Sequence, residues 1–539
     1  MCQDLWFTAC TARTTKIADV SGKMSAVIGA ILKHAFCGKH DPMMAGVMLD
    51  LAGGRGQIRM FLKFGMYTGD ELAIQEVLCT RGANAEKPCF ECLNVKNKHS
   101  SDFKEDVSGY FVDHTELDVR KLKFHSDSSI RRTFTQLRAR YDVEESTAFT
   151  DTQKHLGFTF HHGALLLDPK LTTIFLPVSH VVFDWMHIVF VHGVFGQTFG
   201  QMMMRMRRYE ITYSSLHDYL QLWQWPGRIK SRGVTGKGCC DPTHATKWYS
   251  DGQFHPSASE SLSLYSVIAY YFMNSVGVDS GVLVDEVVTF LLLCDLIDEL
   301  LLISRKDPRA TPDVLMSKTM KFLRQFMATY GPVDFTWKFH ALIHLPWMFA
   351  QHLILFACFV HERKHKLIKR YAKDIYNTSQ DYERSVICEI TDHHLSLVES
   401  HAFDYSPRLF DVIKKPSQAI VATLREEFGD ALAGRLDIKL GKSARYNEWG
   451  IMHVGDVIYG RCDGEVYVGR AYYIASVAGE ILIGLERWVF VAATKGGSRW
   501  RTSTDDPIMM DAMDVMETLI WSVDRGIATV IMPPWLPSL

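Results

Sequence analysis

The stretch HERKHKLIKRYAKD, residues 361–374, directly follows the apolar run 353–360, and the rest of the chain is organised around it. Its spacing predicts a helix that carries one acid, Glu362, on a basic face. A carboxylate beside several cations stays ionised at neutral pH, so Glu362 could hold a divalent metal while its neighbours contact phosphates. The basic residues available for that contact are Arg363, Lys366, Lys369, Arg370 and Lys373. A solvated helix with an ordinary Glu–Lys pair fits the same pattern.

The composition is that of a globular protein with local rather than general basic character. The chain has 539 residues, 22% charged and 47% hydrophobic, with a formal net charge of −2. This length allows roughly three domains. The net charge excludes a uniformly basic nucleic-acid coat, so DNA or RNA would have to bind to a local patch.

Several features predict a soluble protein of the nucleus or another intracellular compartment. The 12 cysteines are mostly isolated within apolar runs, which is typical of reduced thiols. The first residues, MCQDLWFTACTARTTK, lack the order of a signal peptide. The longest apolar run, VVTFLLLCDLIDELLLI, contains Asp295, Asp298 and Glu299 and falls short of a membrane span. No membrane partner is expected.

A possible zinc half-site lies at KPCFECLN, where Cys89 and Cys92 are separated by two residues. This gap lets two thiolates reach one tetrahedral ion from a single turn. No second CxxC occurs in the chain, so a structural Zn²⁺ would need histidine ligands. Two plain reduced thiols remain the alternative. The candidate histidines are His99, His114, His125, His155, His161 and His162.

A second candidate site lies at Asp184, which follows two β-like runs in TTIFLPVSHVVFDWMHIVF. A carboxylate at the end of a buried strand points into the crevice where α/β sheets bind ligands. His187 would share a face with Asp184 if a helix begins here. Asp184 could equally be an ordinary helix N-cap.

Four parts of the chain are predicted. Residues 1–189 and 338–405 are the N-terminal and C-terminal parts of one core, 190–337 is a helical insertion between them, and 406–539 is a C-terminal domain. In chain order these are the first to fourth parts. The first contains a strand from Leu5 to Arg13, a helix at SAVIGAILKHAFC and a hairpin around Gly53, Gly54 and Gly56. The second is a block of capped amphipathic helices with a loop from Gly227 to Asp241. The third carries KFHALIHLP and the Glu362 helix.

The fourth predicted domain is β-rich and is expected to fold independently. Its apolar and polar residues alternate, and Gly interrupts the pattern every few residues, which predicts a small barrel or curled sheet of five or six strands. A final hairpin turns at Asp524, Arg525 and Gly526, and a short helix, SQAIVATLREEF, lies on the linker before the sheet.

Four motifs in order, KPCFECLN, FDWMHIVFVHGVFG, KFHALIHLP and CFVHERKHKLIKRYAKD, resemble the transposases of CACTA-type cut-and-paste elements and related transposon-derived proteins. Asp184 and His187 match the family's D-x-M-H strand end, which carries its second catalytic Asp. Glu362 and Arg363 match its E-R pair, preceded here by Val360-His361 instead of Pro-Phe. The resemblance spans roughly Leu5 to His394, and the last β-rich segment is similar to the module that ends many such proteins.

The resemblance implies an RNase H-like mixed sheet with a large helical insertion, in which two Asp and one Glu hold two Mg²⁺ or Mn²⁺ ions for DNA strand cleavage and transfer. Asp184 and Glu362 would be the catalytic metal ligands and DNA the partner. A homo-oligomer is left open. The strand that carries the family's first Asp has no counterpart before Leu5, so we expect this chain to be catalytically inactive, with Asp4 and Asp50 the nearest substitutes. A non-catalytic DNA-binding or protein-interaction protein is the alternative.

Overall fold

The computed structural model describes residues 8–12, 14–38, 41–51, 54–105, 108–230, 240–274, 276, 284–375, 381–399, 404–413, 418, 422, 426, 438–447, 450–477, 479–502 and 507–537. The chain forms two compact units. The core unit comprises Thr8–Val194 and Ala310–Glu389, and the sheet unit comprises Phe195–Arg309 and Ile390–Leu539. The domain boundaries expected after residues 189, 337 and 405 stay predictions, because compactness alone does not show which parts fold independently.

The core unit begins with two helices and a hairpin. These are α1 Thr14–Ala18, α2 Lys23–Phe36, β1 Val47–Asp50 and β2 Gln57–Met60. The strands β1 and β2 pair antiparallel, with Asp50 opposite Gln57, so the predicted helix and hairpin are confirmed. The predicted strand from Leu5 to Arg13 is wrong where it can be checked, because residues 8–12 form no strand. In this segment the Thr11 hydroxyl donates to the Glu383 carbonyl, 3.2 Å away. Alternating hydrophobicity alone does not make a strand, because a strand also needs a neighbouring strand to pair with.

The core unit contains a short parallel strand pair. β3 Tyr67–Gly69 runs alongside β6 Val181–Phe183, with Gly69 opposite Phe183. Each strand leads directly into a helix that an aspartate caps: Asp70 begins α3 Glu71–Leu78, and Asp184 begins α6 Trp185–Val189. The two aspartates therefore follow directly on paired residues at one edge of the strand pair.

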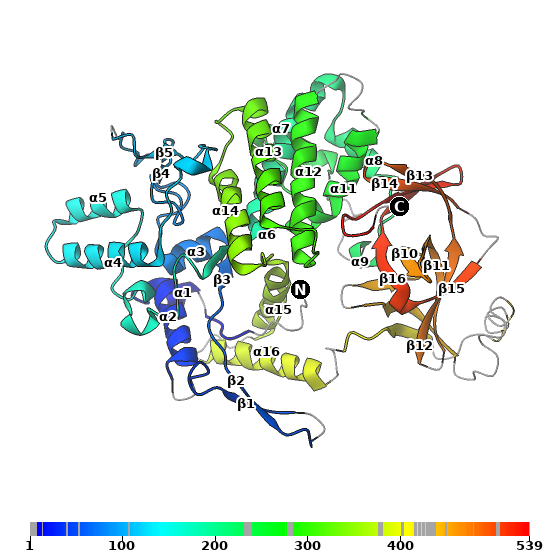
Figure 1. Cartoon of the computed structure of the whole chain (residues 1–539), viewed down its shortest axis with the longest axis horizontal. Coiled ribbons are helices and arrows are strands. Elements are labelled where there is room, and N and C mark those ends of the chain that lie inside the picture. The colour runs from blue at the N-terminus through cyan, green and yellow to red at the C-terminus, as the bar shows by residue number, and fades with distance from the viewer. Residues whose placement is uncertain are drawn as a thin grey trace. The chain divides into compact units, whose positions relative to one another are not determined.

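Figure 1 shows the remaining helices and strands of the core unit. Between β3 and β6 lie β4 Val95–Lys96, β5 Val112–Asp113, η3 Val119–Lys121, α4 Asp127–Tyr141, α5 Ser146–Leu156, η4 Leu165–Leu167 and η5 Pro169–Leu171. After the helical block come α13 Pro312–Tyr330, α14 Trp337–His352, α15 Phe359–Asp374 and the first part of α16 Tyr382–Glu399, a helix that the boundary between the units divides after Glu389. α14 packs against both α13 and α6 and continues through Pro346.

The helical block expected after Phe190 is confirmed over the described residues. It consists of α7 Val194–Met206, η6 Arg207–Tyr209, α8 Tyr213–Gln221, α9 Gly227–Lys230, α10 Pro242–Asp251, α11 Ala258–Asn274 and α12 Val284–Ser304, followed by α13. The loop expected from Gly227 to Asp241 is wrong at its start, where α9 forms one helical turn, and residues 231–239 lie outside the described part.

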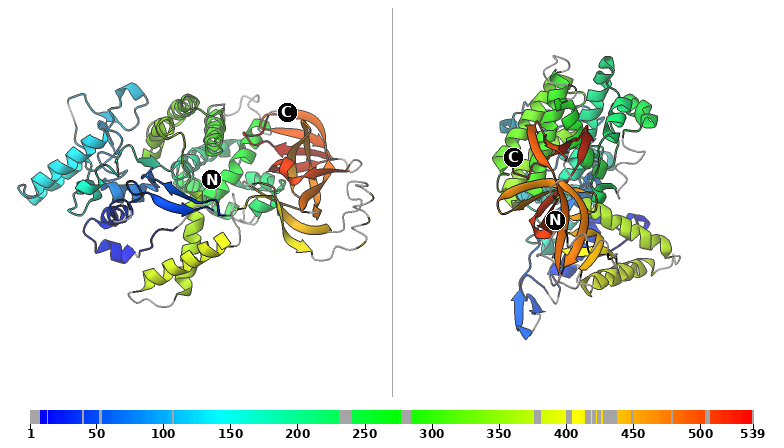
Figure 2. Two further views of the ribbon diagram at one scale, coloured as in Figure 1. Left: turned by 60° about the horizontal axis from the view of Figure 1, so that its bottom comes forward. Right: turned by 90° about the vertical axis from the view of Figure 1, so that its right-hand side faces the viewer.

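The sheet unit ends in a curled antiparallel sheet and a smaller four-stranded one (Figure 2). The strands are β7 Arg408–Ile413, β8 Ile438–Arg445, β9 Ile451–His453, β10 Val457–Cys462, β11 Glu465–Val477, β12 Glu480–Arg487, β13 Val489–Thr494, β14 Gly497–Arg501, β15 Pro507–Asp511, β16 Val515–Leu519, β17 Trp521–Asp524 and β18 Ile527–Ile531.

The predicted curled sheet is confirmed, but the expected number of five or six strands is wrong, because eight described strands pair in it. The main path runs β15-β12-β11-β10-β16, and its two end strands are joined by the single turn η9 Ala512–Asp514. Ile458, Ile474 and Ile483 fill its interior. The last hairpin pairs Asp524 with Ile527, as the turn residues predicted. The short helix SQAIVATLREEF lies almost wholly outside the described residues.

Among the described helices, none combines the length and the apolar character that crossing a membrane requires.

Candidate metal centre

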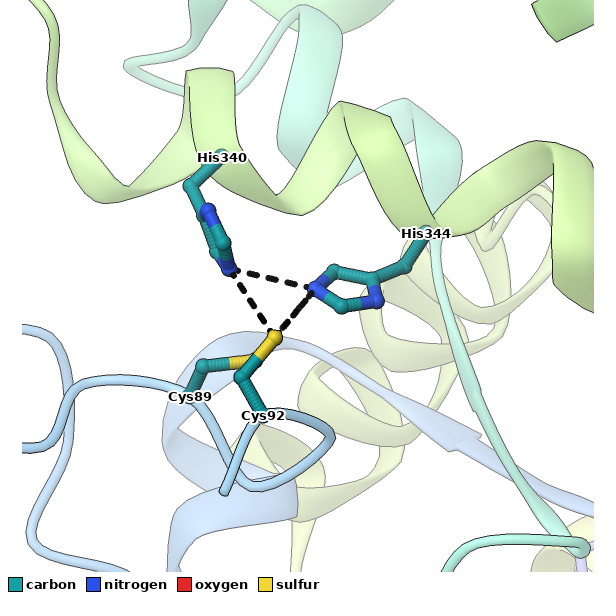
Figure 3. A group of neighbouring side chains, drawn as sticks. All are labelled: Cys89, Cys92, His340 and His344. Atoms are coloured by element: carbon teal, nitrogen blue, oxygen red, sulfur yellow. Dashed lines mark hydrogen bonds between the residues drawn. The ribbon is translucent and has the colours of Figure 1, made fainter. Parts of the chain in front are cut away.

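Four side chains from two distant parts of the core unit converge on one point (Figure 3). Cys89 and Cys92 come from the loop after α3, and His340 and His344 come from α14. Cys89 Sγ lies 3.4 Å from His344 Nε2, and Cys92 Sγ lies 3.5 Å from His340 Nε2 and 3.6 Å from His344 Nε2. The two Nε2 atoms are 3.2 Å apart.

These distances suit a tetrahedral ion. Zinc with Zn–S bonds of about 2.3 Å and Zn–N bonds of about 2.0 Å separates its donors by roughly 3.3–3.8 Å. All four residues are buried. The set is therefore a closed Cys₂His₂ cluster that could hold a metal such as zinc.

Local structure explains why the four donors face one another. His340 and His344 are four residues apart on α14, so their side chains lie on the same face one turn apart. The two-residue gap between Cys89 and Cys92 turns both thiols to one side of the loop. A backbone bridge from Cys92 to Phe124 ties this loop to the segment between η3 and α4.

The electrostatics of the cluster favour a cation. Burial alone would raise the pKa of Cys89, but the hydrogen bond from Cys92 and the nearby His344 and His340 hold that pKa well below its ordinary value. Burial, together with the Cys89 thiolate, raises the pKa of Cys92 well above its ordinary value. Burial also lowers the pKa of His340, so its neutral, metal-ligating form is favoured. A divalent ion would remove the repulsion between two thiolates.

The histidines expected to complete the zinc site are not its ligands, and that part of the prediction is wrong. The histidines concerned are His99, His114, His125, His155, His161 and His162, all of which lie outside the cluster. His114 instead bonds to the Phe335 carbonyl at 2.9 Å, and His125 bonds to Ser129 Oγ at 2.9 Å. The missed signal was the pair of histidines four residues apart in KFHALIHLP, inside an apolar helix.

A second cluster contains Asp184, His187 and Cys358. One carboxylate oxygen of Asp184 accepts from the backbone N–H groups of Met186, at 2.9 Å, and Cys358, at 3.1 Å. The other contacts His187 Nδ1. Asp184 is 2% exposed and caps α6, so the N-cap interpretation is confirmed.

A cavity of about 380 Å³ opens beside this cluster. Asp70 and Asp184, at the ends of the parallel strands, both line it, together with Glu71, His187 and Lys338. Burial raises the pKa of Glu71, and the charge of Lys338 partly offsets that rise. Burial lowers the pKa of Lys338, and the charge of Glu71 partly offsets that fall. Lys338 Nζ donates to the backbone carbonyl of His187 at 3.2 Å.

Asp70 was not recognised as a site residue from the sequence. The strand before it, YTG, is too short to be distinguished from a loop in the sequence. The signal that could have identified Asp70 is a pair of short runs that each end in Asp. Asp50, the substitute expected from the sequence, lies on the exposed hairpin and accepts from Gln57 Nε2 at 2.6 Å. Asp4 lies outside the described residues.

The predicted Glu362 helix is confirmed as α15. Its N-cap is Cys358, whose backbone N–H donates to Asp184, so the structure brings the start of this helix to Asp184. The side chains of Glu362, Arg363 and Lys366 lie outside the described part of the chain. The remaining basic residues of the predicted phosphate-binding face are exposed, namely Lys369, Arg370 and Lys373.

The site thus consists of a closed Cys₂His₂ cluster and, in the same unit, an acid-lined cavity. One residue that lines the cavity, Asp184, is hydrogen-bonded to the N-cap of the basic helix α15. Neither a model of a known protein family nor a curated protein matches this sequence.

Proposed function

We propose that this chain is a transposon-derived, DNA-binding protein of the nucleus, whose core unit has an RNase H-like fold and whose helix α15 contacts DNA phosphates. The observation that carries the proposal is the placement of α15. Its N-cap, Cys358, is hydrogen-bonded to Asp184 at the carboxyl edge of the parallel strand pair, and the basic residues Lys369, Arg370 and Lys373 are exposed farther along the same helix. A crevice at the carboxyl ends of parallel strands is where α/β folds bind ligands.

Charge supports DNA as the partner more than an acidic protein. The chain as a whole is close to neutral, so a cluster of cations on one helix is a local feature. Lysine and arginine on one helix face can follow a row of phosphates, and each neutralised phosphate releases a counterion. The Cys₂His₂ cluster would, with zinc bound, hold the cysteine loop and α14 in place beside the cavity.

The proposal is tested by measuring binding of the full chain to duplex DNA over a range of salt concentrations. The double charge reversal Arg370→Glu with Lys373→Glu should weaken DNA binding at least tenfold. It should also reduce the magnitude of the slope of log affinity against log salt by about 2, because two phosphate contacts are lost.

A matched control reverses Lys321→Glu and Arg324→Glu, two exposed cations with the same three-residue spacing on α13. This control should bind DNA with nearly wild-type affinity. Equal loss in both double variants would mean that only general charge attracts DNA, and no salt-dependent binding by the wild-type chain would contradict the proposal.

Metal-dependent strand cleavage is a second candidate function, favoured by the shared cavity edge of Asp70 and Asp184. With Glu362 on α15, these residues would be the acids for Mg²⁺ or Mn²⁺. Against it, Asp184 is clustered with the imidazole of His187 and the thiol of Cys358, which are poor ligands for Mg²⁺. Nicking of supercoiled DNA that is lost in both Asp70→Asn and Glu362→Gln would establish this activity, and its absence from the wild-type chain would leave DNA binding alone.

A further inference from the structure

We propose that Asp184, His187 and Cys358 form a second metal site, which binds a zinc-class ion and keeps one coordination position open to the cavity. This inference does not rest on DNA binding, and a count of bound metal tests it whether or not the chain binds DNA.

The three donors are already gathered by the backbone. Asp184 and His187 are three residues apart across the first turn of α6, and Cys358 is the N-cap of α15. One donor atom from each lies within 4.8 Å of the others. The backbone N–H groups of Met186 and Cys358 hold one carboxylate oxygen, which turns the other oxygen toward His187. That oxygen contacts His187 Nδ1, and an ion bound by the cluster would replace this contact.

The chemistry of the donors selects the metal. Magnesium prefers an octahedron of oxygen ligands and keeps several waters, whereas a thiolate and an imidazole suit zinc or cobalt. Asp184 and Cys358 are buried, and His187 is only partly exposed. A divalent ion here would offset the negative charge of the Asp184 carboxylate and of a deprotonated Cys358. These two negative groups, together with the neutral imidazole of His187, balance the charge of Zn²⁺, so the site would be uncharged overall.

The two clusters differ in how complete they are. The Cys₂His₂ cluster supplies four protein donors, which is the composition of a closed structural site. The Asp–His–Cys cluster supplies three, and two of them line the cavity of about 380 Å³. Three protein ligands with a fourth position facing a cavity is the arrangement in which zinc holds a water or another small ligand. We therefore assign that position to a water.

The test is the zinc content of the purified full chain, measured by mass spectrometry after dialysis against low zinc. We expect two ions per chain in the wild type and one in Cys358→Ala and in His187→Ala. Replacing zinc with Co²⁺ should give a sulfur-to-cobalt absorption band, which Cys358→Ala lowers by about one third because one of three thiolate ligands is lost.

The matched control is Cys294→Ala, which removes a buried thiol of α12 outside both clusters. It should retain two ions and the full cobalt band. Circular dichroism of each variant checks that it is folded. If Cys358→Ala does not fold, the number of zinc ions per chain in His187→Ala and in the wild type still tests the inference. One ion per chain in the wild type, or two ions in both Cys358→Ala and His187→Ala, would overturn the inference.

Discussion

At the scale of single residues, sequence signals that act over a few positions are reliable in this chain. Asp70 and Asp184 cap helices, with Ala73 N–H donating to Asp70 at 2.7 Å. Arg525 and Gly526 both have positive φ in the two-residue turn of the last hairpin. Each of these features depends only on neighbours in sequence. The partners of Cys89 and Cys92 could not be found in this way, because the bonds to His340 and His344 span about 250 residues.

His125 should make the stability of the core unit depend on pH. Burial, with the charge of Lys87, lowers its pKa from 6.5 to about 4. The unfolded chain takes up a proton near pH 6.5, whereas the folded chain does so only near pH 4. The contribution of His125 to stability is thus fully present above pH 6.5 and is lost as the pH falls toward 4, by at most roughly 3 kcal/mol.

This is measured by urea unfolding between pH 7 and pH 4.5 in excess zinc. His125→Gln, which keeps a hydrogen-bonding group for Ser129, should flatten the dependence, whereas His99→Gln at an exposed position should not. An unchanged slope in His125→Gln would show that other groups determine the acid sensitivity.

At the scale of elements, a buried charge network joins the curled sheet to two elements of the helical block within the sheet unit. Glu517 of β16 is fully buried and pairs with Arg228 of α9 at 2.7 Å and with Arg305, just after α12, at 2.6 Å. Tyr446 donates to the same carboxylate at 3.1 Å. Burial opposes ionisation, but the two guanidinium groups hold the pKa of Glu517 below its ordinary value.

Glu517→Gln should lower the free energy of unfolding by about 3–5 kcal/mol, because it leaves two guanidinium groups without their counter-charge. The comparison is Glu486→Gln on β12, whose pairing with Arg470 at 3.1 Å is half exposed and should matter by less than about 1 kcal/mol. Chemical denaturation gives both values. Equal, small effects would mean that the network contributes little.

At the scale of the whole molecule, periodicity predicted the helical block and the curled sheet, whereas a core interrupted by that block was expected only from the resemblance. The core unit is assembled from both sides of the helical block, which no local pattern indicates. The network at Glu517 also bears on the expectation that residues 406–539 fold by themselves, because that fragment lacks Arg228 and Arg305. The RNase H-like sheet stays a proposal, since the described strands of the core unit form only two-stranded pairs.

The candidate metal centre joins the cysteine loop to α14 across the core unit. Anomalous diffraction at the zinc absorption edge, from crystals of the full chain, tests it directly. We predict a peak about 2.3 Å from Cys89 Sγ and Cys92 Sγ and about 2.0 Å from the Nε2 atoms of His340 and His344. A zinc peak on the two cysteines completed by other residues, or no peak there in zinc-loaded protein, would contradict it.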